Sequence, residues 1–211
     1  MNIARLKPLS IYKQSHNMTS LSKLSESWPS RKLLMIIDPQ VDFINGTLPV
    51  PGAEAAMNDL ARYITQTDGD YTLKIVTADR HPFNHFSFKD FGGRWPSHCI
   101  HDTVGAAIWP PLVNPLYLTA GDVRFFYKGE SADIEEYSIF QNQEAKVRIV
   151  SIINDKGINQ IDICGLAGDV CVLNTLCDGI DLFGRDMFNV LLRFSPSLDG
   201  GTALNNILNH P

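Results

Sequence analysis

The sequence predicts an α/β fold in which helices cover both faces of an open, mostly parallel sheet. From residue 32 onward, short apolar runs of strand length alternate with amphipathic stretches of helical period. The apolar runs are nearly continuous, which is typical of strands that are buried on both faces of a parallel sheet. Strands that alternate with helices favour repeated βαβ units, and these units build such a sheet.

Five apolar runs are predicted as strands. The first is Leu33–Ile37, which ends at Asp38, and each of the others also stops at a polar residue or a turn. The four further runs are 73–77, which leads to Asp79; 123–127, which leads to Lys128; 161–164, which leads to Gly165; and 187–192.

Four helices are predicted between and after these strands. Apolar residues recur at helical spacing over 53–64, after a turn rich in Pro and Gly. The other predicted helices are 145–155, with Gly157 as its stop; 170–183, closed by Gly184; and 201–208, at the end of the chain.

Length and composition indicate one ordinary globular domain, which we expect to span 31–211. The chain has 211 residues, 44% of them hydrophobic and 19% charged, and this composition excludes a disordered or collagen-like protein. The net charge of −5 disfavours a nucleic-acid-binding domain, because phosphate contacts require a basic face. No run of about 18 apolar residues occurs, so we expect no membrane-spanning segment.

Residues 1–30 differ from the rest of the chain. They contain seven serines and four basic residues but a single acid, Glu26, and they lack the apolar core of a secretory signal. We expect a flexible N-terminal extension or a start codon assigned too early, with Met18 as the true start. A mitochondrial transit peptide and an arm that packs on a neighbouring subunit are the alternatives.

Polar residues that could take part in binding or catalysis lie where the predicted strands end. Asp38, Asp79, Lys128 and the segment 165–171 each follow or close an apolar run. Ligands of open α/β sheets bind outside the carboxyl ends of the strands, so we expect these residues to converge on one site. Turns also favour Asp and Gly, so any single member of the set could be structural.

Four of the six histidines lie between residues 81 and 101. Asp79 and His81 are spaced so that both side chains lie on one face of a strand end, and His98 can close the group from a loop. One carboxylate and two imidazoles suit zinc, iron or manganese and leave coordination positions open. His85 and His101 can equally be solvated loop residues.

One of the four cysteines stands apart. Cys171 follows a strand-to-helix turn, where the helix N-terminus can stabilise a thiolate and the free N–H groups can stabilise an oxyanion. Cys99, Cys164 and Cys177 are expected to serve packing. The absence of a signal sequence suits four thiols that stay reduced.

The motifs in this chain resemble those of the isochorismatase-like cysteine hydrolases, and in particular those of their nicotinamidase branch. The resemblance covers about residues 32 to 209, and the motifs occur in the order found in the family. They are Asp38-Pro39-Gln40-Val41-Asp42-Phe43, Asp79-x-His81-Pro82-x-x-His85-x-Ser87-Phe88, Trp95-Pro96-x-His98-Cys99, Lys128-Gly129 and Gly165-x-Ala167-x-Asp169-x-Cys171-Val172.

This resemblance implies a sheet of about six strands in a three-layer, Rossmann-like sandwich, and it assigns roles to individual residues. Cys171 is the implied nucleophile, Asp38 the acid/base and Lys128 its cationic partner. The remaining implied assignments are an oxyanion hole from the N–H groups of Ala167 and Cys171, a cis peptide bond at Leu166–Ala167, metal ligation by Asp79, His81 and His98, and a ring sandwich by Phe43 and Trp95. His85 matches a position that binds metal in only some members, so its ligation stays open.

The function implied by the resemblance is hydrolysis of nicotinamide to nicotinate and ammonia for NAD salvage, with pyrazinamide as a further substrate. The implied cofactor is one divalent ion, Zn²⁺ first and Fe²⁺ or Mn²⁺ as alternatives. We expect a cytoplasmic homo-oligomer that binds a small molecule, and neither nucleic acid nor membrane. The alternatives are another hydrolase of the superfamily acting on a carbamoyl compound or isochorismate, a catalytically silent metal-binding or scaffolding protein, and a structural-zinc protein.

Overall fold

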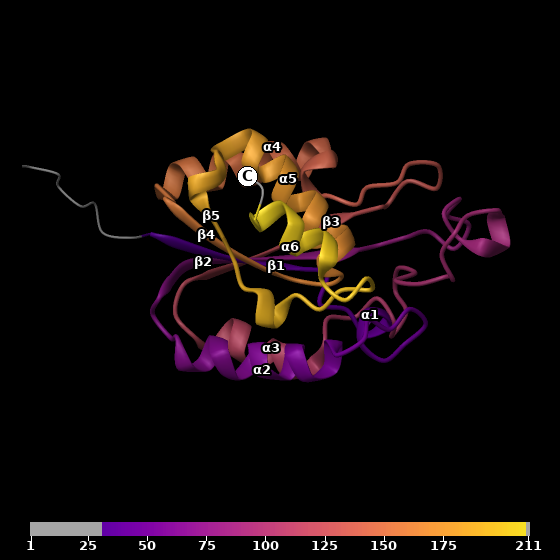
Figure 1. Cartoon of the computed structure of the whole chain (residues 1–211), viewed down its shortest axis with the longest axis horizontal. Helices are drawn as coiled ribbons and strands as arrows, with labels where there is room; N and C mark the ends of the chain where they lie inside the picture. The colour runs from indigo at the N-terminus through magenta and orange to yellow at the C-terminus, as the bar shows by residue number, and fades with distance from the viewer. Residues whose placement is uncertain (1–30, 210–211) are drawn as a thin grey trace, which may run out of the picture.

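The structure, a computed structural model, describes residues 31–209 and contains one parallel sheet of five strands (Figure 1). Their order in the sheet is β3-β2-β1-β4-β5. The strands are β1 (Lys32–Ile37), β2 (Tyr71–Asp79), β3 (Asp122–Lys128), β4 (Gln160–Gly165) and β5 (Phe188–Val190). The helices are α1 (Val41–Ile44), α2 (Ala53–Gln66), α3 (Pro110–Leu118), α4 (Gln143–Lys156), α5 (Leu173–Phe183) and α6 (Thr202–Asn209).

Helices cover both faces of the sheet, which confirms the predicted fold class. Figure 1 shows α2 and α3 below the sheet and α4, α5 and α6 above it. Alternate residues of β1 supply both cores, because successive side chains of a strand point to opposite faces. Leu34 and Ile36 pack in the core that contains α2, whereas Leu33, Met35 and Ile37 pack in the core that contains α4 and α5. This two-sided burial explains the continuous apolar run.

The expectation of about six strands is wrong for the described residues, which form five. The last predicted strand, 187–192, is also shorter than expected. Only Phe188–Val190 pairs with β4, because the flanking segments Arg185–Met187 and Leu192–Phe194 turn as 3₁₀ helices. Apolar composition alone does not distinguish such turns from a continued strand.

Two helices, α1 and α3, were not predicted from the sequence. A third helix was predicted, but its first turn differs from the prediction. α1 is only four residues long, and α3 contains Pro110, Pro111 and Pro115, which are helix breakers in most contexts. The first two prolines are tolerated because N–H groups of the first turn have no helical partner. The predicted helix 170–183 is divided into a π-helical turn, Gly168–Val172, and α5.

The strand register brings the predicted site residues to one edge of the sheet. Asp79 is paired with Lys128 at the ends of β2 and β3, and Ile37 is paired with Gly165 at the ends of β1 and β4. Asp38 directly follows the end of β1, and the segment that leads to Cys171 directly follows the end of β4. The two segments therefore begin side by side.

The predicted extension at residues 1–30 lies outside the described residues, and the assignment of 31–211 to a single domain stays a prediction. Within residues 31–209, no helix has both the length and the apolar composition needed to cross a bilayer.

Candidate active site

A buried lysine links the two carboxylates that the sequence places at strand ends. Lys128 Nζ lies 2.9 Å from Asp38 Oδ2 and 2.5 Å from Asp79 Oδ1, and its side chain is 1% exposed. The same ammonium lies 3.6 Å from Cys171 Sγ. Burial alone lowers the pKa of Lys128, but the surrounding carboxylates outweigh it and raise that pKa well above its ordinary value. Lys128 is therefore a permanent cation between two acids and a thiol.

Asp38 is held in place by the neighbouring strand, with one carboxylate oxygen left available. Thr77 Oγ1 donates a hydrogen bond to Asp38 Oδ1 at 2.6 Å. Oδ2 is paired with the charge of Lys128 but accepts no aligned hydrogen bond from the described residues. The backbone φ of Asp38 is +45°, a left-handed conformation that is unusual for a side chain this buried and is typical of functional sites.

The protonation of Asp38 and Cys171 is set by their surroundings. Burial raises the pKa of Asp38, and the nearby Lys128 cation opposes this rise only in part. Burial likewise raises the pKa of the Cys171 thiol well above its ordinary value, again against the opposing charge of Lys128. A thiol of this kind needs an adjacent base, and a carboxylate with a raised pKa is a stronger base than an ordinary one. One oxygen of Asp38 and the sulfur of Cys171 lie within 4.8 Å of each other.

The turn that carries Cys171 requires two glycines. A Cβ on Gly165 would lie 2.0 Å from the Ile37 carbonyl oxygen, so β4 and β1 could not approach as they do. A Cβ on Gly168 would lie 2.3 Å from Ser197 Oγ. The intervening peptide bond Leu166–Ala167 is cis, as the resemblance implies. Within the described residues the Ala167 N–H makes no hydrogen bond, so it is free to meet an oxyanion beside Cys171.

Asp79, His81 and His98 form a group of metal-ligand type. One ligand atom from each lies within 4.8 Å of the other two, and all three residues are buried. His81 Nδ1 lies 2.9 Å from the Gly129 carbonyl oxygen, and His98 Nδ1 lies 2.7 Å from that of Pro96. Each carbonyl oxygen accepts the Nδ1–H of its ring, which fixes the ring and leaves the lone pair of Nε2 for a metal, the arrangement that metal-binding histidines use. These three residues therefore fit a divalent cation.

The electrostatics of Asp79 and His98 also suit a cation. Although burial raises the pKa of Asp79, the charges of Lys128 and the two histidines outweigh it and hold that pKa below its ordinary value. Burial lowers the pKa of His98, which favours the neutral imidazole that a metal requires. The carboxylate of Asp79 outweighs burial at His81 and raises the pKa of that ring.

His85 stands next to the group but offers it no free nitrogen. Its Nδ1 lies 2.7 Å from Ser87 Oγ, and its Nε2 lies 3.0 Å from the Ile134 carbonyl oxygen. The His85 ring packs against His81, with centroids 4.3 Å apart. This geometry favours a supporting role for His85.

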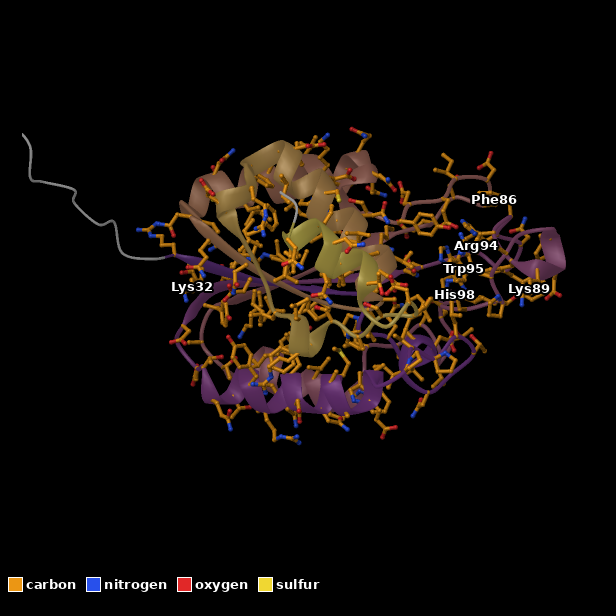
Figure 2. The ribbon with its side chains drawn as sticks, in the orientation of Figure 1. Lys32, Phe86, Lys89, Arg94, Trp95 and His98 are labelled. Carbon is orange, nitrogen blue, oxygen red and sulfur yellow. The ribbon has the colours of Figure 1, made fainter. Side chains whose placement is uncertain are left out.

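A small pocket opens beside these groups, and aromatic residues form part of its lining. Phe43 packs against the His98 ring with centroids 5.3 Å apart. Trp95 donates its indole N–H to Tyr137 Oη at 3.1 Å and is covered by the Arg94 guanidinium at 4.3 Å. Figure 2 shows Trp95 and His98 together at one end of the molecule and Lys32, the start of β1, at the other. The pocket lining is Phe43, Leu48, Val50, Asp79, His81, Trp95, His98, Glu135, Tyr137, Ala167, Val170, Cys171 and Leu198.

Four residues at the site were not assigned roles from the sequence. Thr77 and Gln40 hold carboxylate-bearing residues from one strand away, and Glu135 and Tyr137 line the pocket. Gln40 lies inside the Asp38–Phe43 motif, and Tyr137 begins a Tyr-Ser-x-Phe segment, so the sequence could have marked both as site residues. No motif marks Thr77 or Glu135, because their roles depend on tertiary contacts.

Comparison with known proteins gives the family of this chain. The Isochorismatase domain family matches residues 32–190. The chain is 32% identical over 154 residues to the nicotinamidase/pyrazinamidase of Mycobacterium tuberculosis, covering 71% of this chain and 78% of that protein.

Two solved structures are similar in fold and sequence. The pyrazinamidase of Pyrococcus horikoshii in complex with zinc superposes with a TM-score of 0.69 at 28% identity, over 85% of this chain and 95% of that one. PnC1 from L. infantum in complex with nicotinate also gives a TM-score of 0.69, at 25% identity, over 85% and 88% of the two chains. The chain is a hydrolase that belongs to the isochorismatase family.

Proposed function

We propose that this chain is a metal-dependent nicotinamidase, which converts nicotinamide to nicotinate and ammonia in NAD salvage and also hydrolyses pyrazinamide. The observation that carries the proposal is that one lysine connects two sites. Lys128 Nζ contacts Asp38 beside the thiol and Asp79 in the metal-ligand group, so both groups face one pocket. The names of the relatives support the choice of substrate.

Asp38 and Cys171 carry the first half of the proposed reaction. Asp38 Oδ2 takes the proton from Cys171 Sγ, and Lys128 stabilises the thiolate. The sulfur attacks the carboxamide carbon, and the N–H groups of Ala167 and Cys171 stabilise the resulting oxyanion. Asp38 then gives its proton to the amide nitrogen as the C–N bond breaks, so ammonia leaves and a thioester remains.

The second half returns the enzyme to its starting state. Asp38 takes a proton from a water molecule, whose oxygen attacks the thioester carbon. The C–S bond breaks, the proton returns to Cys171 Sγ, and the acid leaves. Phe43 and Trp95 are proposed to sandwich the ring throughout.

The proposed ligands of the cation are Asp79, His81 and His98, with Zn²⁺ as first choice and Fe²⁺ or Mn²⁺ as alternatives. These residues would hold a cation that supplies a Lewis acid for the pyridine nitrogen, and this contact would align the carboxamide. The ligand group also separates this proposal from the runner-up, another hydrolase of the superfamily that acts on a carbamoyl compound or isochorismate. Those branches are expected to lack the aspartate and two histidines. A cytoplasmic location and a homo-oligomeric state stay predictions.

An ammonia-release screen tests the proposed substrate. We expect nicotinamide and pyrazinamide to give kcat/KM values about 100-fold or more above those of carbamoyl compounds, because only the two ring amides offer both a ring nitrogen and a carboxamide to the site. Isochorismate contains no amide, so the same enzyme is assayed separately for its hydrolysis. A higher kcat/KM for isochorismate or a carbamoyl compound would contradict the proposed function.

Replacing His98 with alanine tests the metal site. We expect bound metal to fall and KM for nicotinamide to rise about 10- to 100-fold, because one of three ligands is lost. Metal content is measured by elemental analysis. His101→Ala is the matched control, since the half-exposed side chain of His101 bonds to Asp102, whereas its backbone bond to His81 is retained in the variant. Equal metal content in the His98 variant and wild type removes His98 from the ligand set.

A further inference from the structure

Gln40 lies beside the site without lining the pocket, and its side chain is fully buried. Two of its three hydrogen bonds go to the backbone of the proposed ligand Asp79, and the third goes to Ala106. Its Nε2 donates to the Asp79 carbonyl oxygen at 2.8 Å and to that of Ala106 at 2.9 Å. Its Oε1 accepts the Asp79 N–H at 2.7 Å. A single amide side chain thus pairs with both backbone groups of one residue.

The reason for this pairing lies in the way β1 ends. In a parallel sheet, the N–H and C=O of a residue point toward the same neighbouring strand. β1 pairs with β2 only as far as Ile36 and Val76, and the chain turns at Asp38, whose φ is +45°. The backbone of Asp79 would therefore face an absent strand with two buried, unpaired groups, which is costly. The Gln40 amide takes the place of the missing strand.

Asp42 has the same relation to the segment that carries His98. Its Oδ2 accepts the Cys99 N–H at 2.7 Å, and its Oδ1 accepts the Thr47 N–H at 3.1 Å. Cys99 directly follows His98 and has a φ of +46°, and its carbonyl oxygen accepts the His81 N–H at 3.0 Å. The Cys99 residue is thus held by Asp42 on its N–H and by His81 on its carbonyl.

The carboxylate of Asp42 is closely packed between two glycines. A Cβ on Gly105 would lie 2.1 Å from Asp42 Oδ2, and a Cβ on Gly46 would lie 2.3 Å from Oδ1. Asp42 is 7% exposed, so water does not compete for its oxygens. Its position relative to the His98 segment is therefore fixed.

We propose that Gln40 and Asp42 are positioning residues that set the separation between the proposed ligands Asp79 and His98. Both side chains extend from the short segment that begins at Asp38, the proposed acid/base. The same segment therefore also orients two proposed ligands, Asp79 at the end of β2 and His98 in the 95–99 loop. This inference rests on the proposed metal site but does not depend on which amide is hydrolysed.

Titration of Co²⁺ into the metal-free full chain tests the inference, with the visible absorption spectrum reporting coordination geometry. Gln40→Met keeps the side-chain size and removes all three hydrogen bonds. We expect it to raise the dissociation constant for Co²⁺ about 10-fold or more and to shift the absorption bands, because outer partners of metal ligands have effects of this size. Gln40→Asn retains the amide on a shorter side chain and should change both readouts in the same direction by less.

The matched control is Tyr71→Phe, at the other end of β2. Its hydroxyl donates a buried hydrogen bond to Asp162 Oδ2 at 2.7 Å, far along the strand from Asp79. We expect Tyr71→Phe to lower Tm while leaving the Co²⁺ affinity and spectrum unchanged. A wild-type affinity and spectrum in both Gln40 variants, with only a lower Tm, would show a purely structural role and overturn the inference.

Asp42→Asn and His98→Ala complete the experiment. Asp42→Asn replaces one of the two acceptor oxygens and should also weaken Co²⁺ binding, whereas an unchanged affinity would remove Asp42 from the inference. If Co²⁺ affinity does not depend on His98, the metal site itself is wrong and this inference fails with it. Since none of these measurements uses turnover, failure of the proposed nicotinamidase activity is seen separately in the ammonia assay.

Discussion

Replacing Cys171 with alanine is expected to lower kcat/KM for ammonia release from nicotinamide by about four orders of magnitude or more, because the covalent route is lost entirely. The fold should survive. Cys171 is buried at the end of the core that contains α4 and α5, and removal of one sulfur atom leaves only a small cavity. The measurement is steady-state ammonia release together with circular dichroism and Tm.

Cys177→Ala is the matched control for this experiment. Cys177 is a free, partly buried thiol on α5, one helix segment beyond the turn that holds Cys171. We expect its replacement to leave kcat/KM unchanged. Full activity in the Cys171 variant would remove that residue from the nucleophile position, whereas loss of activity in both variants would point to a general effect on the fold.

Replacing Lys128 with methionine is expected to remove activity and to destabilise the fold by about 3–5 kcal/mol, the usual cost of leaving a buried charge without its partner. Asp38 and Asp79 would then face each other in a buried site with no cation between them. Burial already raises the pKa of Asp38 in the wild type, and loss of Lys128 removes the group that opposes that rise.

The pH dependence of this variant has a defined sign. A carboxyl group whose folded pKa lies above its unfolded value destabilises the fold at high pH, and the loss is recovered as pH falls and the group is protonated. We therefore expect the stability deficit of Lys128→Met to be larger at pH 8 than at pH 5. In the wild type, the raised pKa of Lys128 and the lowered pKa of Asp79 contribute stability throughout that interval. Denaturant unfolding of the metal-free wild type and variant measures the stability deficit at pH 8 and at pH 5.

A double variant separates charge from fold. Asp38→Asn combined with Lys128→Met removes one carboxylate with the cation and should recover much of the lost stability, but no activity. If the double variant is as unstable as Lys128→Met alone, the ion pair is not the source of the effect. A deficit for Lys128→Met that does not change between pH 5 and pH 8 would contradict the charge argument in the same way.

The fold class was predictable from the sequence because burial on two faces produces an apolar run that few other elements produce. β1, β2 and β4 are buried along most of their length and appear in the sequence as such runs. β3 lies at the end of the sheet order, and its run includes the exposed residues Arg124 and Tyr127. All four strands end within two residues of their predicted ends. β5 was predicted three residues too long, and α3 was not predicted. A three-residue strand between two 3₁₀ turns and a helix with three prolines owe their form to tertiary contacts rather than to local pattern.

The candidate site was predictable in part for the same reason. Asp38, Asp79 and Lys128 are marked by their place at strand ends, and Asp79, His81 and His98 by their ligand chemistry. The residues that hold them in place were not predictable. Thr77 and Gln40 act through hydrogen bonds to residues 39 positions away, and no spacing in the sequence encodes such a contact.

The pairing of Asp79 with Lys128 and of Ile37 with Gly165 restricts where this chain can change in length. One residue added within β1, β2, β3 or β4 would rotate the following side chain to the opposite face of the sheet and carry a site residue away from its partners. The segments 82–94 and 129–137 follow strand ends and lie outside the strands of the sheet, so a change in their length leaves the register of those strands intact. Divergence among enzymes built on this sheet should therefore be concentrated in these loops, of which 129–137 supplies Glu135 and Tyr137 to the lining of the pocket.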